Sequence, residues 1–150
     1  MILRDEILIN TTPDRIFDFF EQMDENYLRW HPDHLLFRWE QGRGLSKGVE
    51  FYFEERIGGQ LLKKRVRFTR IEPNRHIEFA VTNPLIRLIM PRLLFAIEPQ
   101  GEQCRFIAEI HIRTGPIGAR LNAREFNAVR QHMKEEGENL KQILEAQGQA

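Results

Sequence analysis

His132 and Glu136 are the residues of this chain whose types and spacing most clearly suggest chemistry. They lie in the segment 126–146, where apolar residues recur every three or four positions, as in an amphipathic helix. One helical turn separates the two side chains, so they share a face, and Glu136 falls where the apolar stripe should continue. A carboxylate there must be solvated, paired or bound to a cation, and the imidazole one turn earlier can bind the same metal ion. The stripe consists of Phe126, Val129, Met133, Leu140, Ile143 and Leu144.

A second carboxylate is predicted on the inward face of a strand. Phe51 and Phe53 alternate with polar neighbours, so strand parity places Glu55 on their side and Glu54 on the opposite side. The strand should end at a hairpin over Gly58-Gly59. Because a slip of one residue in the register would exchange the two carboxylates, both Glu54 and Glu55 remain candidates.

Two further histidines, His31 and His34, flank Pro32 in the turn after a predicted short helix. Two inward carboxylates and the histidine of the C-terminal helix, beside a turn rich in imidazoles, would repel and desolvate one another without a cation. The combination therefore predicts a metal site, with His31 and His34 as alternative ligands from the turn.

Each of these residues also has an ordinary structural interpretation. A histidine and a glutamate four positions apart on a helix commonly form only a solvated hydrogen bond. Glu55 could pair with Lys63 or Lys64 across the hairpin, and the two histidines could be plain turn residues. The metal interpretation depends on the combination of residues and not on any one of them.

The elements that must position these residues follow from apolar alternation and turn residues. A strand over 2–10 precedes a helix that starts at Thr11-Thr12-Pro13-Asp14, and a second short helix covers 26–30. Gly115-Pro116 opens a long C-terminal helix, and a frayed tail begins at Gln147. The predicted fold class is α+β: a curved antiparallel sheet of about seven strands, with its helices on one face. The remaining strands are expected around 35–39, 49–55, 62–72, 77–81, 93–97 and 106–112.

Composition narrows the classes of protein. One hundred and fifty residues, 41% hydrophobic and 29% charged, fit one globular domain over 1–150. Basic and acidic residues number 22 each, which argues against a nucleic-acid partner. Cys104 is the sole cysteine, which excludes an internal disulfide and suits a reducing compartment. A charged N-terminus and the lack of a long apolar run predict a cytoplasmic protein without membrane insertion; nothing in the sequence indicates its oligomeric state.

The order of these elements, the opening residues 9–17 (INTTPDRIF) and the closing amphipathic helix resemble the START-like, Bet v 1-like (SRPBCC) superfamily. This superfamily includes polyketide cyclases, lipid carriers and plant hormone receptors. The resemblance covers nearly the whole chain and implies a helix-grip fold, in which the sheet wraps around the long C-terminal helix. It leaves the function open among carriers, receptors and enzymes.

Three motifs resemble, more specifically, the zinc-dependent diacetylphloroglucinol hydrolases of this superfamily. They are a histidine after a Trp-containing turn, a glutamate before an Ile-Gly-Gly hairpin, and the His-x-x-x-Glu pair of the last helix. The resemblance implies that His34, Glu55, His132 and Glu136 bind the metal, with His31 competing at the turn. Mixed histidine and carboxylate ligands suit Zn²⁺, with Fe²⁺, Mn²⁺ and cobalt as competitors.

The expected function is hydrolysis, by a bound metal, of a small aromatic or polyketide-like carbonyl compound at an ester or carbon–carbon bond. His31 would act as the catalytic proton shuttle. The alternative is a non-enzymatic carrier of a lipid, polyketide or other small hydrophobic ligand. The apolar segment 84–91 is expected to cover the core or to form a lid. The residues predicted to line the cavity are Phe37, Trp39, Phe51, Phe53, Phe79, Phe95 and Met133.

Overall fold

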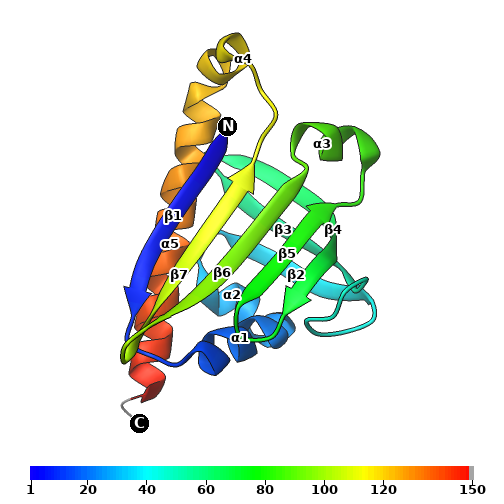
Figure 1. Cartoon of the computed structure of the whole chain (residues 1–150). Helices are drawn as coiled ribbons and strands as arrows, with labels where there is room; N and C mark the ends of the chain where they lie inside the picture. The colour runs from blue at the N-terminus through cyan, green and yellow to red at the C-terminus, as the bar shows by residue number, and fades with distance from the viewer. Residues whose placement is uncertain (149–150) are drawn as a thin grey trace.

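Seven antiparallel strands form one sheet in the order β1-β7-β6-β5-β4-β3-β2 in the computed structural model, which describes residues 1–148 (Figure 1). This order confirms the predicted α+β fold class. Every two neighbouring strands are antiparallel, and the helices pack against the sheet and do not separate its strands. The strands are β1 (Ile2–Ile9), β2 (His34–Gln41), β3 (Glu50–Ile57), β4 (Gln60–Glu72), β5 (His76–Val81), β6 (Arg92–Gln100) and β7 (Gln103–His111). The helices are α1 (Pro13–Glu21), α2 (Met23–Trp30), α3 (Pro84–Ile89), α4 (Pro116–Leu121) and α5 (Ala123–Gly148).

The C-terminal helix is shorter at its start than the sequence predicted. The helix that opens at Pro116 ends at Leu121, and α5 begins anew after Asn122. The side-chain amide of Asn122 donates a hydrogen bond to the carbonyl oxygen of Gly118 at 2.8 Å, which is the local bonding that makes asparagine a helix terminator. At the other end α5 continues through Gly148, beyond the predicted start of the tail, and 149–150 lie outside the described residues. The second helix also begins earlier than predicted, at Met23.

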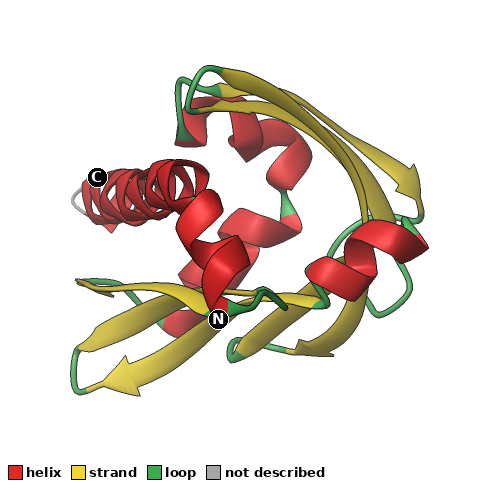
Figure 2. Cartoon of the chain, turned by 90° about the horizontal axis from the view of Figure 1, so that it is seen from above, coloured by secondary structure: helices red, strands yellow, loops and turns green. Residues whose placement is uncertain are grey.

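The long helix α5 lies across the open side of the curved sheet (Figure 2). Leu140 and Leu144, two residues of the predicted stripe, are fully buried. Gly137 gives α5 its close approach to β1: a Cβ atom there would lie 3.1 Å from the Asp5 carboxylate and 3.5 Å from a methyl group of Ile7. A glycine inside a helix costs about 1 kcal/mol relative to alanine, and here it permits this contact. No helix among residues 1–148 is both long enough and apolar enough to cross a membrane.

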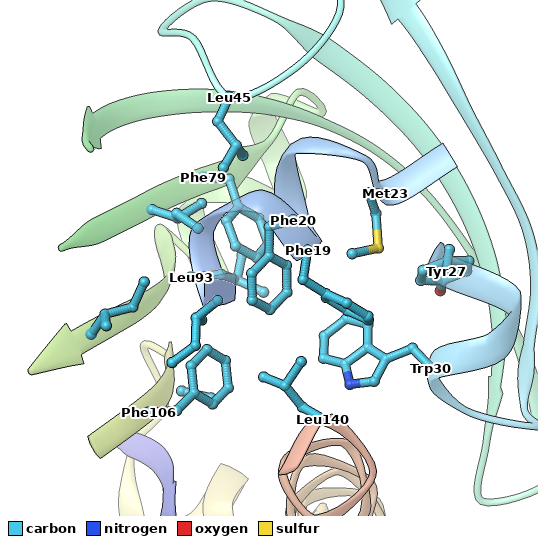
Figure 3. Close-up of a cluster of buried hydrophobic side chains, with 14 of the residues drawn as sticks. Phe19, Phe20, Met23, Tyr27, Trp30, Leu45, Phe79, Leu93, Phe106 and Leu140 are labelled. Carbon is cyan, nitrogen blue, oxygen red and sulfur yellow. The ribbon is translucent and has the colours of Figure 1, made fainter. Parts of the chain in front are cut away.

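Aromatic and aliphatic side chains of α1, α2, the sheet and α5 pack into a buried core (Figure 3). Phe20 stacks on Phe106 with ring centroids 5.7 Å apart, and Phe19 meets the indole of Trp30 edge-on at 5.8 Å. Such pairs add about 0.5–1.5 kcal/mol each to the hydrophobic gain. Because this cluster ties α1 and α2 to the sheet and to Leu140, it fixes the position of the turn that follows α2.

The β3–β4 hairpin has the turn that the sequence predicted. Gly58 and Gly59 both have positive φ, 59° and 80°, which favours glycine at the two central positions of a hairpin turn. The turn sets the register that places Glu55 opposite Leu62 on β4, while His34 pairs with Glu55 from β2. A histidine and a glutamate thus become neighbours on the inner face of the sheet.

Candidate metal centre

A cavity of about 790 Å³ lies between the sheet and α5. Its volume is in the range typical of small-molecule sites, and its walls are mainly apolar. Trp39 was predicted to line it but does not; its ring instead packs edge-on against Phe37 at 5.0 Å. The other predicted lining residues do face the cavity: Phe37, Phe51, Phe53, Phe79, Phe95 and Met133.

Four of the predicted site residues meet at one place on this cavity. His34, Glu55, His132 and Glu136 each direct one donor atom into a group whose atoms all lie within 4.8 Å of one another. His34 Nε2 lies 2.8 Å from Glu136 Oε2 and 3.7 Å from Glu55 Oε2, and His132 Nε2 lies 3.3 and 3.4 Å from the Glu55 and Glu136 oxygens. Two ligands on one tetrahedral zinc ion are about 3.3–3.6 Å apart. The two His132 distances lie in this range, whereas the His34–Glu136 distance of 2.8 Å is that of a hydrogen bond and would have to lengthen around an ion.

Strand parity explains why Glu55 and not Glu54 belongs to this group. Glu55 is buried on the same face as Phe51 and Phe53. Glu54 faces the other way, where its carboxylate accepts a hydrogen bond from the Tyr52 hydroxyl at 2.7 Å. The structure therefore brings Glu55 into the cavity and leaves Glu54 outside.

His34 is held in one tautomer by the end of α2. Its Nδ1 lies 2.7 Å from the carbonyl oxygen of Tyr27, and since a carbonyl can only accept, Nδ1 carries the proton. Nε2 then presents its lone pair to Glu136 Oε2, a contact at 2.8 Å that requires a proton or a cation between the two atoms. A backbone carbonyl that orients the far nitrogen in this way is typical of metal-binding histidines.

The pKa shifts of His132 and Glu136 indicate that the group of four residues requires positive charge. Burial by itself lowers the pKa of His132, but the carboxylates of Glu136 and Glu55 outweigh it and raise that pKa to about 10. Burial by itself raises the pKa of Glu136, yet the two histidines more than offset it and hold this pKa well below its ordinary value. His132 Nε2 is buried without a well-aligned hydrogen-bond partner. Protons or a divalent cation can supply the missing charge, and the donor set fits zinc.

Two residues of α2 complete the surroundings: Tyr27, which the sequence did not single out, and Trp30, which it marked only as part of the turn motif. The Tyr27 hydroxyl donates to Glu55 Oε2 at 3.3 Å, and the Tyr27 ring stacks on His34 with centroids 3.9 Å apart. Burial, followed by the nearby carboxylates, raises the pKa of Tyr27. The indole nitrogen of Trp30 donates to the backbone oxygen of Glu136 at 2.9 Å, which clamps α2 to α5. The helical spacing of Met23, Tyr27 and Trp30 was the available signal.

His31 is near the group but is not one of its four members. Its Nδ1 accepts the backbone N–H of Asp33 at 2.9 Å, so its Nε2 donates to Glu135 Oε1, also at 2.9 Å. This hydrogen bond is the main cause of the lowered pKa of Glu135. The His31 ring lies 4.4 Å from that of His132. His34 thus joins the two carboxylates, whereas His31 forms a second group with His132 and Glu135, whose donor atoms also lie within 4.8 Å of one another.

The segment 84–91 forms the short helix α3 instead of covering the core. Asn83 caps this helix by accepting the backbone N–H of Leu85 at 2.9 Å. Leu85 and Leu88 are 74% and 61% exposed, whereas Met90, just after the helix, lines the cavity. The segment therefore borders the cavity and leaves its apolar helical face in solvent.

Comparisons with known proteins identify the family and the fold of the chain. Residues 2–145 match the profile of a family described as polyketide cyclase / dehydrase and lipid transport. No curated protein matches the chain. Among solved structures, the protein TTHA0849 from Thermus thermophilus has a TM-score of 0.73 at 14% identity, covering 97% of this chain and 98% of that one.

Two further structures share the fold at low sequence identity. Protein Ms6760 from Mycobacterium smegmatis has a TM-score of 0.73 at 10% identity, with 97% of this chain and 92% of that chain covered. Ara h 8.0201 has a TM-score of 0.68 at 12% identity, with 97% and 98% covered. These likenesses support a Bet v 1-like helix-grip fold, and the profile match spans nearly the whole chain. The chain belongs to the polyketide cyclase / dehydrase and lipid-transport family.

Proposed function

We propose that this protein is a metal-dependent hydrolase of a small aromatic or polyketide-like carbonyl compound. The observation that carries the proposal is the convergence of His34, Glu55, His132 and Glu136 on one side of a largely apolar cavity. The resemblance of their motifs to zinc-dependent diacetylphloroglucinol hydrolases supports the reaction class. Zn²⁺ is the preferred metal for this donor set, with Fe²⁺ and Mn²⁺ as alternatives.

A divalent metal at these residues would supply a Lewis acid, which polarises a carbonyl group and makes water more acidic. The protein's own residues have separate roles. The hydroxyl of Tyr27 orients the Glu55 carboxylate, and the backbone carbonyl of Tyr27 orients His34. The apolar walls of the cavity offer an aromatic ring van der Waals contact.

His31 is the residue proposed to transfer a proton. Cleavage of an ester or of an acyl carbon–carbon bond leaves an oxygen or carbon that must gain a proton. His31 does not itself line the cavity: its Nε2 donates to Glu135, and its ring lies beside that of His132, which does line it. The proposed transfer from the His31–Glu135 pair to a leaving group therefore requires the proton to pass the His132 side chain. Glu135 is partly exposed, which lets the pair exchange protons with solvent.

Metal content and activity test the proposal together. Wild-type protein purified without added metal should contain about one equivalent of zinc or another divalent ion by elemental analysis. It should hydrolyse 4-nitrophenyl acetate or an acylated phloroglucinol, and a chelator should abolish this activity. Metal-free protein with unchanged activity would contradict the proposal.

A carrier without chemistry is the second candidate. The size and apolar walls of the cavity favour it, and the family's description includes lipid transport. In that case the four polar residues would form a hydrogen-bonded patch within a binding site. Protein that binds apolar dyes but takes up no metal would favour the carrier over the hydrolase.

A further inference from the structure

Lys64 is a cationic residue on the inner wall of the cavity. It lies on β4, where Val66 and Phe68 point inward at alternate positions and Lys63 is exposed. The register pairs Lys64 with Phe53 and pairs Leu62 with Glu55. Lys64 is therefore the diagonal neighbour of Glu55, at about 7–8 Å between backbones, a distance that a lysine side chain can reach across.

The ammonium group of Lys64 has no close partner in the described part of the chain. It makes neither a hydrogen bond nor an ion pair with any residue of 1–148, although it is half-buried. Burial lowers the pKa of Lys64, and the charges of Glu55 and Glu136 act in the opposite direction. Most lysines in such surroundings extend the ammonium group to water or pair it with a carboxylate.

The nearby carboxylates are already committed to other groups. Glu55 and Glu136 face the two histidines, and a divalent ion bound there would neutralise both. Glu109 lies 3.3 Å from the Arg4 guanidinium group. Arg124 and Glu125, the other charged residues that border the cavity, are exposed at the start of α5. With a metal bound, Lys64 is thus the uncompensated charge of the inner wall.

We propose that Lys64 binds an anionic oxygen of the ligand, such as a carboxylate, phenolate or enolate, and makes the cavity selective for anionic aromatic compounds. This inference deepens the proposed function, on which it rests, by naming the charge class of the compound. A charge-assisted hydrogen bond in a largely apolar cavity is among the stronger polar contacts a ligand can make, so its loss should be easy to measure.

Two fluorescent probes that differ only in one charged group provide the test. Anilinonaphthalene sulfonate carries an anionic group on the same aromatic skeleton as neutral phenylnaphthylamine. Lys64→Met should weaken binding of the sulfonate roughly tenfold and leave binding of the neutral probe unchanged. Lys64→Arg should restore most of the affinity for the sulfonate. Lys63→Met, on the outer face of the same strand, should change neither affinity.

Zinc loading gives an independent readout. Because the metal neutralises the two carboxylates, zinc should strengthen binding of the sulfonate more than binding of the neutral probe, and Lys64→Met should remove most of that difference. Equal losses for both probes, or the same loss in Lys63→Met, would overturn the assignment of Lys64. Failure to bind zinc would count against the proposed hydrolase, whereas the probe comparison in chelator-treated protein would still decide the role of Lys64.

Discussion

His34 Nδ1 donates a hydrogen bond to the backbone carbonyl of Tyr27 at 2.7 Å, and the Tyr27 ring stacks on the imidazole with centroids 3.9 Å apart. One residue of α2 thus fixes the tautomer, the tilt and the position of the histidine on β2. Ligands that are oriented before metal binding lose less entropy when they bind it. The His34 ligand of the candidate site is therefore preformed by helix α2.

Glu136→Gln should reduce zinc affinity by more than the roughly 10–100-fold typical of losing an outer partner, because it removes a ligand. Glu54→Gln should leave zinc affinity unchanged, since Glu54 faces away from the cavity and bonds to Tyr52. Competition titration with a chromogenic chelator measures both affinities. Equal losses in the two variants would show that the site lies elsewhere.

Tyr27→Phe should lower zinc affinity by about tenfold, because it deletes the hydroxyl that donates to Glu55 but keeps the ring that stacks on His34. The matched control is Tyr52→Phe, which deletes the hydroxyl that donates to Glu54 on the outer face of the sheet. Zinc binding followed by calorimetry distinguishes the two. An identical effect in both variants would refute a role for the Tyr27 hydroxyl.

The metal-free protein should lose stability as the pH rises. The carboxylates of Glu136 and Glu55 outweigh burial and raise the pKa of His132 to about 10 in the folded state, above the ~6.5 of an unfolded histidine. The protonated histidine therefore stabilises the fold fully below about pH 6.5, and this contribution disappears as the pH approaches about 10. Its magnitude is on the order of a few kcal/mol.

Urea unfolding at several pH values, with a chelator present, measures this effect. His132→Gln should flatten the fall in unfolding free energy between neutral and alkaline pH. His76→Gln should not, because His76 pairs with Glu78 away from the cavity. A wild-type profile as flat as that of His132→Gln would contradict the electrostatic account.

Removing the metal should lower the melting temperature. An ion at 100 times its dissociation constant stabilises the native state by about 2.7 kcal/mol, which corresponds to roughly 5–10 °C for a chain of this size. Differential scanning calorimetry with and without excess chelator measures the shift. Coincident melting curves would indicate that no ion is bound under those conditions.

The parts of the site that follow from short-range periodicity could be predicted from the sequence. Helical spacing placed His132 and Glu136 on one face, and strand parity placed Glu55 inside. The choice between His31 and His34 could not be made, because it depends on where α2 ends relative to α5. The role of Tyr27 could not be predicted for the same reason, since the contact of its hydroxyl with Glu55 depends on how α2 packs against β3.

Two further differences from the sequence prediction, the helix break at Asn122 and the position of Lys64, depend on local details of bonding and register. The break at Asn122 depends on a side chain that bonds to its own helix in preference to continuing it. Lys64 was read as a possible partner of Glu55 across the hairpin, but the register places Leu62 there. A shift of two residues along the strand decides between an ion pair and an unpartnered charge, and because such a shift keeps every side chain on its own face, periodicity alone does not resolve it.

Glu136 and Gly137 are consecutive on α5, yet they touch opposite edges of the sheet. Glu136 meets His34 on β2, and Gly137 packs against Asp5 and Ile7 on β1. One helical turn thus links the two edge strands, to β1 by close backbone approach and to β2 through the Glu136 side chain. Amide hydrogens of β1, β2 and the middle of α5 should consequently exchange as one cooperative unit, and weakening either contact should raise the exchange rates of both strands.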